Sequence, residues 1–340
     1  MRYTVALLGS LISLCSFGPC SPLCYAEFLN GRDGAASETE GVKIADASSA
    51  SSAAEKETDA QPSVPDYLTA DEFDIEGMPQ QQYMLDIDTA NGELNRIDLA
   101  GTVGYVIEPT GDVDPKRRWV WIVPPWLALP SAHGNYIARY YAEGLLDAGF
   151  HVVGFDVGTS LGSPKGADLF ARFHDHVVKT YDLAPKARMV AVSNGGLITY
   201  GYAFRYPERV ERIFAVYPAL DFRTWPGFEK VVGPGEITPK GLSYGLTPEE
   251  MTKRIAEFNP IDNLKPLARQ NIPIFHIHGD ADELVPLDPN STVTVKRYRE
   301  MGGDIELKVM PGSVHGGMEF FTDEQALQFL LAPSGAGQSL

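Results

Sequence analysis

After residue 119, short apolar runs alternate with amphipathic segments along most of the chain. The apolar runs are typical of strands and cover 119–123, 150–157, 187–192, 210–217, 272–278 and 305–310. Their continuous apolar character indicates strands that are buried on both faces of a parallel sheet. Helical spacing occupies 135–148, 165–181, 195–204, 290–301 and 318–331. This repeated alternation predicts an α/β fold with a mostly parallel, doubly wound sheet.

The ordered domain is expected to span residues 80–334, followed by a flexible tail over 335–340. Two early strands are predicted at 81–89 and 101–109, and the connection between them begins at the turn signal Asn91-Gly92. Residues 222–264 interrupt the strand–helix alternation and contain Trp225, Phe228 and a short predicted helix near 247–258. We expect this insertion to form a short lid over a pocket. The alternative is a surface excursion with its own small core.

Residues 1–26 have the features of a signal peptide. Arg2 precedes an apolar run that ends near Phe17, and small residues precede an expected cleavage after Ala26. A membrane anchor is the alternative, but the run is short for a hydrocarbon core of ~30 Å. We therefore expect a secreted or periplasmic protein with no stable membrane span after cleavage. All three cysteines lie in this segment, so the mature chain is predicted to have no disulfide, thiolate metal site or cysteine nucleophile.

The net charge of −17 is concentrated in one segment. Residues 27–79 hold thirteen acidic and three basic side chains, and residues 47–54 are entirely Ala and Ser. Such a segment cannot bury enough apolar surface to offset the entropy of ordering it, so we predict a disordered acidic linker. The rest of the chain is mildly acidic and has no basic cluster, which argues against a nucleic-acid partner.

Ser193 is the candidate nucleophile. It follows a predicted buried strand and precedes Gly195, Gly196 and a predicted helix. A nucleophile elbow needs this order, because the strained turn exposes the serine and the passing helix leaves room only for small residues. Ala191 stands where the usual Gly-x-Ser-x-Gly pattern has its first glycine, and we expect the elbow to tolerate it. The alternative is an ordinary strand–helix turn with a capping serine.

Asp282 is the candidate acid, because it follows the apolar strand 272–278 and could orient an imidazole there. Three other carboxylates compete with it. Asp280 could brace the turn through backbone N–H groups, Glu283 is expected to face solvent, and Asp221 follows the preceding strand.

His315 is the candidate base, in a glycine-rich loop after the last predicted strand. A lone loop histidine is usually an ordinary surface residue. The order Ser193, Asp282, His315, each after a successive strand of one parallel sheet, is however the order of α/β-hydrolases. The three motifs together are more specific than any one of them.

From about Trp119 to Leu331 the chain resembles the α/β-hydrolase superfamily. It is most similar to the branch of exported bacterial hydrolases that includes dienelactone hydrolases and prolyl-oligopeptidase-like enzymes. The segments DVGTSLGSP (156–164) and HIHGDAD (276–282) carry this likeness. The resemblance implies the fold and a serine-hydrolase mechanism, but no substrate.

The same resemblance implies an oxyanion hole. One donor is the backbone N–H of Asn194, directly after the nucleophile, and the second comes from the loop after strand 119–123. Similar enzymes often have His-Gly-Gly in that loop, where this chain has Pro124-Pro125-Trp126-Leu127. Because proline has no N–H, Trp126 is the preferred donor and Leu127 the next.

The remaining histidines are predicted to be structural. His174 and His176 lie on different faces of a predicted helix, which suits a surface better than a metal site. His276 and His278 share one strand face, but no third ligand converges on them. No metal and no cofactor are therefore expected.

These residues predict a serine hydrolase that cleaves a carboxylic ester through an acyl-enzyme, with Trp225 and Phe228 contacting the substrate. A small-molecule or carbohydrate ester is the expected partner. A prolyl-oligopeptidase-like peptidase is the alternative, although the region before residue 80 is too short for the large propeller of true prolyl oligopeptidases. A non-catalytic binding protein on a hydrolase scaffold is a third hypothesis. The sequence does not indicate the oligomeric state.

Overall fold

The computed structural model describes residues 92–334 except 100–101, 129–137, 158–159 and 228–243. The chain divides into two units, 1–61 and 62–340, and all described residues belong to the second. The predicted signal peptide, linker, strand 81–89 and C-terminal tail lie outside the described residues, as does Phe228. No described helix is both long and apolar enough to cross a membrane.

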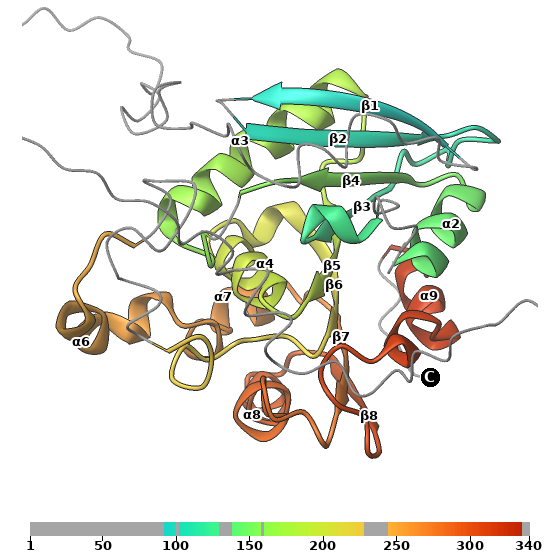
Figure 1. The fold of residues 1–340 in the computed structure, drawn as a ribbon. Coiled ribbons are helices and arrows are strands. Elements are labelled where there is room, and N and C mark those ends of the chain that lie inside the picture. The colour runs from blue at the N-terminus through green and yellow to red at the C-terminus, as the bar shows by residue number, and fades with distance from the viewer. Residues whose placement is uncertain (1–91, 100–101, 129–137, 158–159, 228–243, 335–340) are drawn as a thin grey trace, which may run out of the picture. The chain divides into compact units, whose positions relative to one another are not determined.

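An eight-stranded sheet runs through the described part in the order β1-β2-β4-β3-β5-β6-β7-β8 (Figure 1). The six strands from β4 to β8 along this order pair in parallel, whereas β1 with β2 and β2 with β4 pair antiparallel. The prediction of a mostly parallel α/β sheet is confirmed. The strands are β1 (Gly92–Leu99), β2 (Thr102–Pro109), β3 (Trp119–Val123), β4 (His151–Phe155), β5 (Ala187–Val192), β6 (Val210–Val216), β7 (Ile274–Gly279) and β8 (Ile305–Met310).

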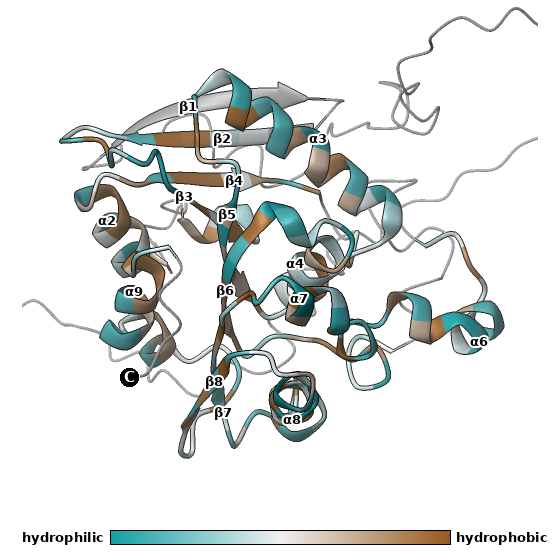
Figure 2. Cartoon of the chain, turned by 180° about the vertical axis from the view of Figure 1, so that it is seen from behind, coloured by the Kyte–Doolittle hydropathy of each residue, from teal (hydrophilic) through white to brown (hydrophobic). Residues whose placement is uncertain are grey.

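Helices cover both faces of the sheet because its strands are apolar on both sides (Figures 1 and 2). In β3, Trp119 and Trp121 pack into the cluster formed with α3 and α4, while Val120 and Ile122 pack into the cluster formed with α2 and α9. The helices of these two layers are α2 (Arg139–Asp147) and α9 (Glu324–Leu331) on one face, with α3 (Pro164–Thr180), α4 (Gly195–Ala203), α7 (Lys265–Arg269) and α8 (Val293–Glu300) on the other. The sheet is doubly wound, as predicted.

Two boundaries differ from the sequence predictions. The hairpin turn lies between the paired residues Leu99 and Thr102, not at Asn91-Gly92, because β1 occupies the predicted connection. Asn-Gly is a strong signal for a hairpin turn, which is why the sequence prediction placed the turn at Asn91-Gly92. The single helix predicted over 318–331 is two, η8 (Met318–Phe321) and α9. Asp323 separates them, since its side chain accepts a hydrogen bond from Ala326 N and caps α9.

The insertion over 222–264 packs into a small apolar cluster that it shares with the core of the domain. Its described elements are α6 (Pro248–Phe258) and η6 (Pro260–Asp262). Thr247 and Glu250 form a capping box that fixes the start of α6. The buried members of the cluster come from the insertion and from four core segments, and they are Leu161, Leu197, Ala219, Phe222, Met251, Phe258 and Val285. The insertion therefore packs against Val285, in the segment that follows Asp282.

Helix α4 begins so close to β3 that its first residues must be glycines. A Cβ atom on Gly195 would lie 2.2 Å from the carbonyl oxygen of Val123. A Cβ atom on Gly196 would lie 2.6 Å from the carbonyl oxygen of Ala219. Both obstacles are backbone atoms, which cannot rotate away as a side chain would.

We predict that Gly195→Ala lowers the free energy of unfolding by about 1–3 kcal/mol, because the added methyl group forces α4 away from β3. The measurement is urea unfolding of parent and variant. Gly111→Ala is the matched control, since no atom lies within 4 Å of the added methyl group, and it should change stability by less than about 0.5 kcal/mol. Equal losses in the two variants would contradict the close approach.

Candidate active site

Ser193 occupies a strained turn between β5 and α4. Its φ is +53°, in the left-handed region that residues with a side chain rarely adopt. Three backbone hydrogen bonds hold it there, from Ser193 N to Val216 O at 3.1 Å and from the N–H groups of Gly196 and Ala219 to Ser193 O at 2.9 Å each. Ala191 is fully buried in β5 and leaves this elbow intact.

The structure brings Ser193, His315 and Asp282 together at the carboxyl edge of the sheet. Ser193 Oγ lies 2.9 Å from His315 Nε2, and His315 Nδ1 lies 2.7 Å from Asp282 Oδ2. The carboxylate side chain is 1% exposed and the imidazole 12% exposed. Because Nδ1–H donates to a carboxylate, Nε2 is left as the acceptor for the serine hydroxyl.

Asp282 is held as an anion by its surroundings. Its Oδ1 accepts hydrogen bonds from the backbone N–H groups of Leu284 and Val285, at 3.0 and 2.8 Å. Burial alone would raise the pKa of this carboxyl, but His278, His315 and the N–H of Val285 outweigh burial and lower the pKa to about 2. The carboxylate therefore stays charged throughout the neutral range.

The three competing carboxylates have other contacts. Asp221 is buried in a network with Arg223, at 3.1 Å, and with Asn259, whose side-chain N–H donates to it at 3.0 Å. Asp280 accepts a 2.6 Å hydrogen bond from Gly312 N, so it braces the loop that leads to His315. Glu283 is exposed, as expected.

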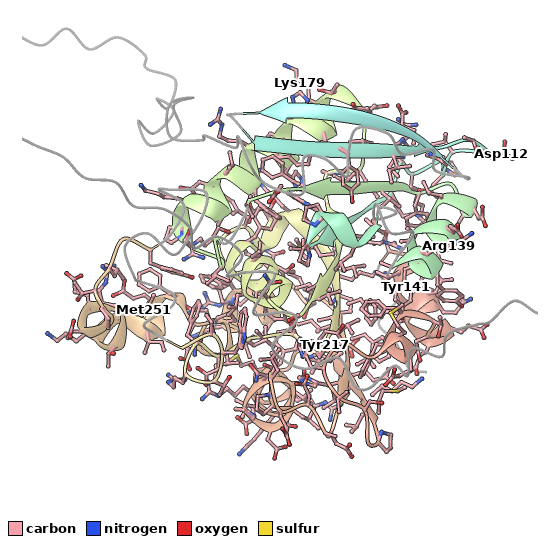
Figure 3. The ribbon with its side chains drawn as sticks, viewed as in Figure 1. Asp112, Arg139, Tyr141, Lys179, Tyr217 and Met251 are labelled. Carbon is pink, nitrogen blue, oxygen red and sulfur yellow. The ribbon has the colours of Figure 1, made fainter. Side chains whose placement is uncertain are left out.

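Tyr217 is a site residue that the sequence analysis did not identify. It directly follows β6, has a φ of +33°, and its ring centroid lies 4.3 Å from that of His315 (Figure 3). Phe320 packs edge-on against the same tyrosine ring at 5.0 Å. The ring thus limits the positions open to the imidazole. In the sequence, the signal for Tyr217 was its position as an aromatic residue directly after β6, the strand that pairs with the nucleophile strand β5.

The oxyanion candidates lie on two elements that meet at the elbow. No described group accepts a hydrogen bond from Asn194 N, which leaves this N–H free for a ligand. Trp126 belongs to η4 (Pro125–Ala128), whose Pro125 carbonyl accepts a hydrogen bond from the Tyr105 hydroxyl of β2. The alternative donor, Leu127 N, already donates to Pro124 O at 3.3 Å. Trp126 therefore remains the preferred second donor.

The predicted substrate residue Trp225 lies partly buried against the apolar cluster of the insertion. Its backbone N–H donates to Asp221 O at 3.1 Å, so the start of the insertion is fixed to the end of the β6 segment. This placement assigns Trp225 a packing role, and a contact with substrate remains a prediction.

One prediction about the histidines needs correction. His174 is buried rather than on the surface, between Pro185 O and the Tyr202 hydroxyl, both at 3.0 Å. Burial lowers its pKa to about 4, so it is a neutral core residue. Helix α3 buries a wider face against the sheet than we expected from the i, i+2 spacing of His174 and His176. Within the described residues, no group of three His, Cys, Asp or Glu side chains is arranged to hold a metal ion.

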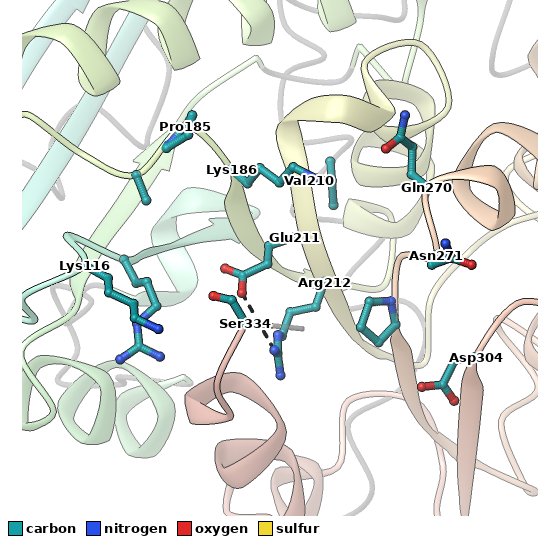
Figure 4. A pocket seen from close by; sticks show the side chains of 13 residues that line it. Lys116, Pro185, Lys186, Val210, Glu211, Arg212, Gln270, Asn271, Asp304 and Ser334 are labelled. Carbon is teal, nitrogen blue, oxygen red and sulfur yellow. Dashed lines mark ion pairs between the residues drawn. The ribbon is translucent and has the colours of Figure 1, made fainter. Parts of the chain in front are cut away.

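A cavity of about 630 Å³ lies at the amino ends of the strands, whereas Ser193 lies at their carboxyl ends. Most of its lining residues precede β3, β5, β7 and β8 or lie at the start of β6, and they include Lys116, Lys186, Arg212, Asn271 and Asp304 (Figure 4). Strand β5 has six residues, or about 20 Å of extended chain, between this cavity and Ser193. Because ligands of open α/β sheets bind at the carboxyl ends of the strands, this cavity is not assigned to the catalytic site.

Comparisons with solved structures agree with this fold. Dipeptidyl peptidase 4 from Porphyromonas gingivalis matches with a TM-score of 0.52 and 17% identity, over 71% of this chain and 35% of that one. A puromycin-hydrolyzing peptidase of Mycobacterium tuberculosis matches with a TM-score of 0.50 and 16% identity, over 70% and 37%. A thermostable esterase matches with a TM-score of 0.50 and 13% identity, over 72% and 63%. The chain thus spans about a third of the length of the two peptidases.

Among curated proteins, none matches the chain. The sequence profile of the prolyl oligopeptidase family matches residues 163–332, which is half of the chain and includes the nucleophile elbow, the acid loop and the histidine loop. Together with the fold, this match shows that the chain has the α/β-hydrolase fold and belongs to the prolyl oligopeptidase family.

Proposed function

We propose that Ser193, His315 and Asp282 form a catalytic triad that hydrolyses acyl compounds through a covalent acyl-enzyme. The observation that carries this proposal is the continuous hydrogen-bonded chain Ser193–His315–Asp282, with steps of 2.9 and 2.7 Å. The strained backbone of Ser193 supports it, because strain of this kind is characteristic of an exposed nucleophile. The unbroken triad also argues against a non-catalytic binding protein.

In this mechanism Ser193 Oγ attacks the acyl carbonyl while its proton passes to His315 Nε2. Asp282 fixes the imidazole through Nδ1–H and stabilises the imidazolium that forms. His315 then protonates the leaving group, and water attacks the acyl-enzyme by the same route in reverse. The N–H groups of Asn194 and Trp126 stabilise the oxyanion, and loss of one such donor costs about 2.7–4 kcal/mol.

The substrate proposed first is a carboxylic ester of a small molecule or a carbohydrate. Esters are intrinsically easier to cleave than amides, so a triad with a two-donor oxyanion hole meets the chemical demand of an ester. A peptide is the second candidate, and the match to the prolyl oligopeptidase family favours it. The insertion is proposed as a partial lid, since its apolar cluster includes Val285, three residues after Asp282.

A fluorophosphonate probe should label the parent protein on Ser193, and Ser193→Ala should abolish both labelling and hydrolysis. Asp282→Asn should reduce kcat by about 10⁴-fold, because the amide favours the wrong imidazole tautomer. Peptide mass spectrometry locates the label, and thermal unfolding checks that the variants are folded. A labelled Ser193→Ala variant would place the nucleophile elsewhere.

Esters should exceed a matched peptide amide by at least about tenfold in kcat/KM, a difference of roughly 1.4 kcal/mol in the barrier. Trp225→Ala should change the ratio between a bulky and a short acyl ester, because a lid residue contacts the larger group. His315→Ala should lower both esters alike, by about 10²–10⁴-fold, because it removes the general base. If the peptide is cleaved as efficiently as the best ester, the peptidase alternative replaces the esterase.

We further propose that the protein is exported and cleaved after Ala26, on the basis of the apolar run that ends near Phe17 and the small residue at the cleavage position. The full chain, produced in a bacterial host, should appear outside the cytoplasm with Glu27 as its first residue. Intact mass and N-terminal sequencing measure this. A cytoplasmic protein that retains residues 1–26 would rule out export.

A further inference from the structure

A chain of four fully buried polar side chains runs behind Asp282. The Tyr200 hydroxyl lies 2.7 Å from His276 Nε2, and His276 Nδ1 lies 3.0 Å from Ser291 Oγ. Ser291 Oγ also lies 2.9 Å from His278 Nδ1, and His278 Nε2 lies 2.8 Å from Val285 O. All four side chains are 0% exposed, and none of them belongs to the triad.

The acceptor at one end fixes the direction of every hydrogen bond. Val285 O can only accept, so His278 Nε2 carries a proton, and the direction that gives every proton in the chain an acceptor has His278 Nδ1 accepting from Ser291. The single hydroxyl proton of Ser291 is then used, so His276 Nδ1–H donates to Ser291 Oγ. His276 Nε2 is therefore the acceptor for Tyr200. The reverse direction would leave the Tyr200 proton without an acceptor among the described groups, a costly state in a buried site.

The donor end of this chain meets the acid of the triad. His278 Nε2 lies 3.5 Å from Asp282 Oδ2, the oxygen that faces His315. The same N–H binds Val285 O, while Val285 N binds Asp282 Oδ1 at 2.8 Å. His278 therefore holds both the carboxylate and the backbone that supports it.

The chain also connects the elements that carry the triad. His276 and His278 lie on β7, which leads to Asp282, and Ser291 lies in η7 (Asp288–Thr292). Tyr200 lies in α4, the helix that begins two residues after Ser193. Burial lowers the pKa of His276 to about 3 and raises the pKa of Tyr200, so neither group changes charge near neutral pH. These two groups therefore keep the protonation states that this hydrogen-bond order requires.

We propose that His278 is a positioning residue for Asp282, oriented by the chain Ser291–His276–Tyr200, and that this chain aligns the acid with the nucleophile. The inference rests on the proposed triad. It assigns a role to two histidines and a serine that take no part in the reaction steps. Hydrogen bonds that all point one way polarise one another, which strengthens the final N–H, the one that binds Val285 O and lies 3.5 Å from Asp282 Oδ2.

The test compares His278→Leu, which removes the donor, with His278→Gln, whose amide N–H can take the place of Nε2–H. His278→Leu should lower kcat by about 10–100-fold with KM within about twofold, because small misplacements of a catalytic group have effects of this size. His278→Gln should recover most of the loss. His174→Leu is the matched control, since it removes another buried histidine that lies away from the triad.

The pH profile of kcat/KM separates positioning from a general loss of folded protein. A displaced Asp282 stabilises the protonated His315 less, so the acid limb should move to lower pH in His278→Leu. It should not move in His174→Leu or His278→Gln. Tyr217 and Asp282, the titratable groups described in contact with His315, are present in all three variants. If kcat/KM of His278→Leu is lower at every pH but its acid limb stays where the parent has it, the inference is overturned.

Fluorophosphonate labelling of the parent keeps the two proposals distinct. If the label is not on Ser193, the triad fails and the inference fails with it. If Ser193 is labelled but His278→Leu retains the kcat and acid limb of the parent, only the positioning role fails. Should His278→Leu not fold, Ser291→Ala breaks the chain with the loss of one hydroxyl group, and it should lower kcat by about 3–10-fold with the same shift of the acid limb.

Discussion

The left-handed backbone of Ser193 is the constraint on which the rest of the site depends. A φ of +53° is unfavourable for serine, by roughly 1–2 kcal/mol, and it persists only because neighbouring backbone groups fix it. β6, the segment after it and the first turn of α4 supply these partners, and α4 begins within van der Waals contact of the end of β3. The position of Ser193 is thus set by the sheet, and the same close approach places Gly195 beside Pro124, at the start of the loop that contains Trp126.

The polar groups behind the serine meet a different requirement, which is to keep a buried charge in one place. Asp282 is almost fully buried, and an unpaired carboxylate there would be costly. Two backbone N–H groups, His315 and His278 surround it, so its charge is retained and its orientation is fixed. The buried hydrogen-bonded chain from His278 to Tyr200 connects Asp282 to α4, so the acid and the nucleophile are held by connected elements.

The sequence was most informative where the physical signal was local. Ser193, Asp282 and His315 each follow a short apolar run that predicts a strand. Parallel strands bring the residues at their carboxyl ends to one edge of the sheet. The competing Asp221 could not be set aside from sequence, because its partners Arg223 and Asn259 converge only in the fold. Tyr217 and Ser291 were missed for the same reason, since their roles depend on side chains from other elements. His174 was misplaced because helical spacing gives the face of a residue but not how much of the helix is covered.

The central claim is that Ser193 attacks an acyl carbonyl whose oxygen is then held by Asn194 and Trp126. A crystal structure of the protein inhibited by an alkyl fluorophosphonate tests it most directly, because the phosphonyl group resembles the tetrahedral intermediate. The account predicts a covalent bond from Ser193 Oγ to phosphorus, with the phosphonyl oxygen about 2.7–3.1 Å from the backbone N–H groups of Asn194 and Trp126. A covalent bond to another residue, or a phosphonyl oxygen directed away from both N–H groups, would contradict the account.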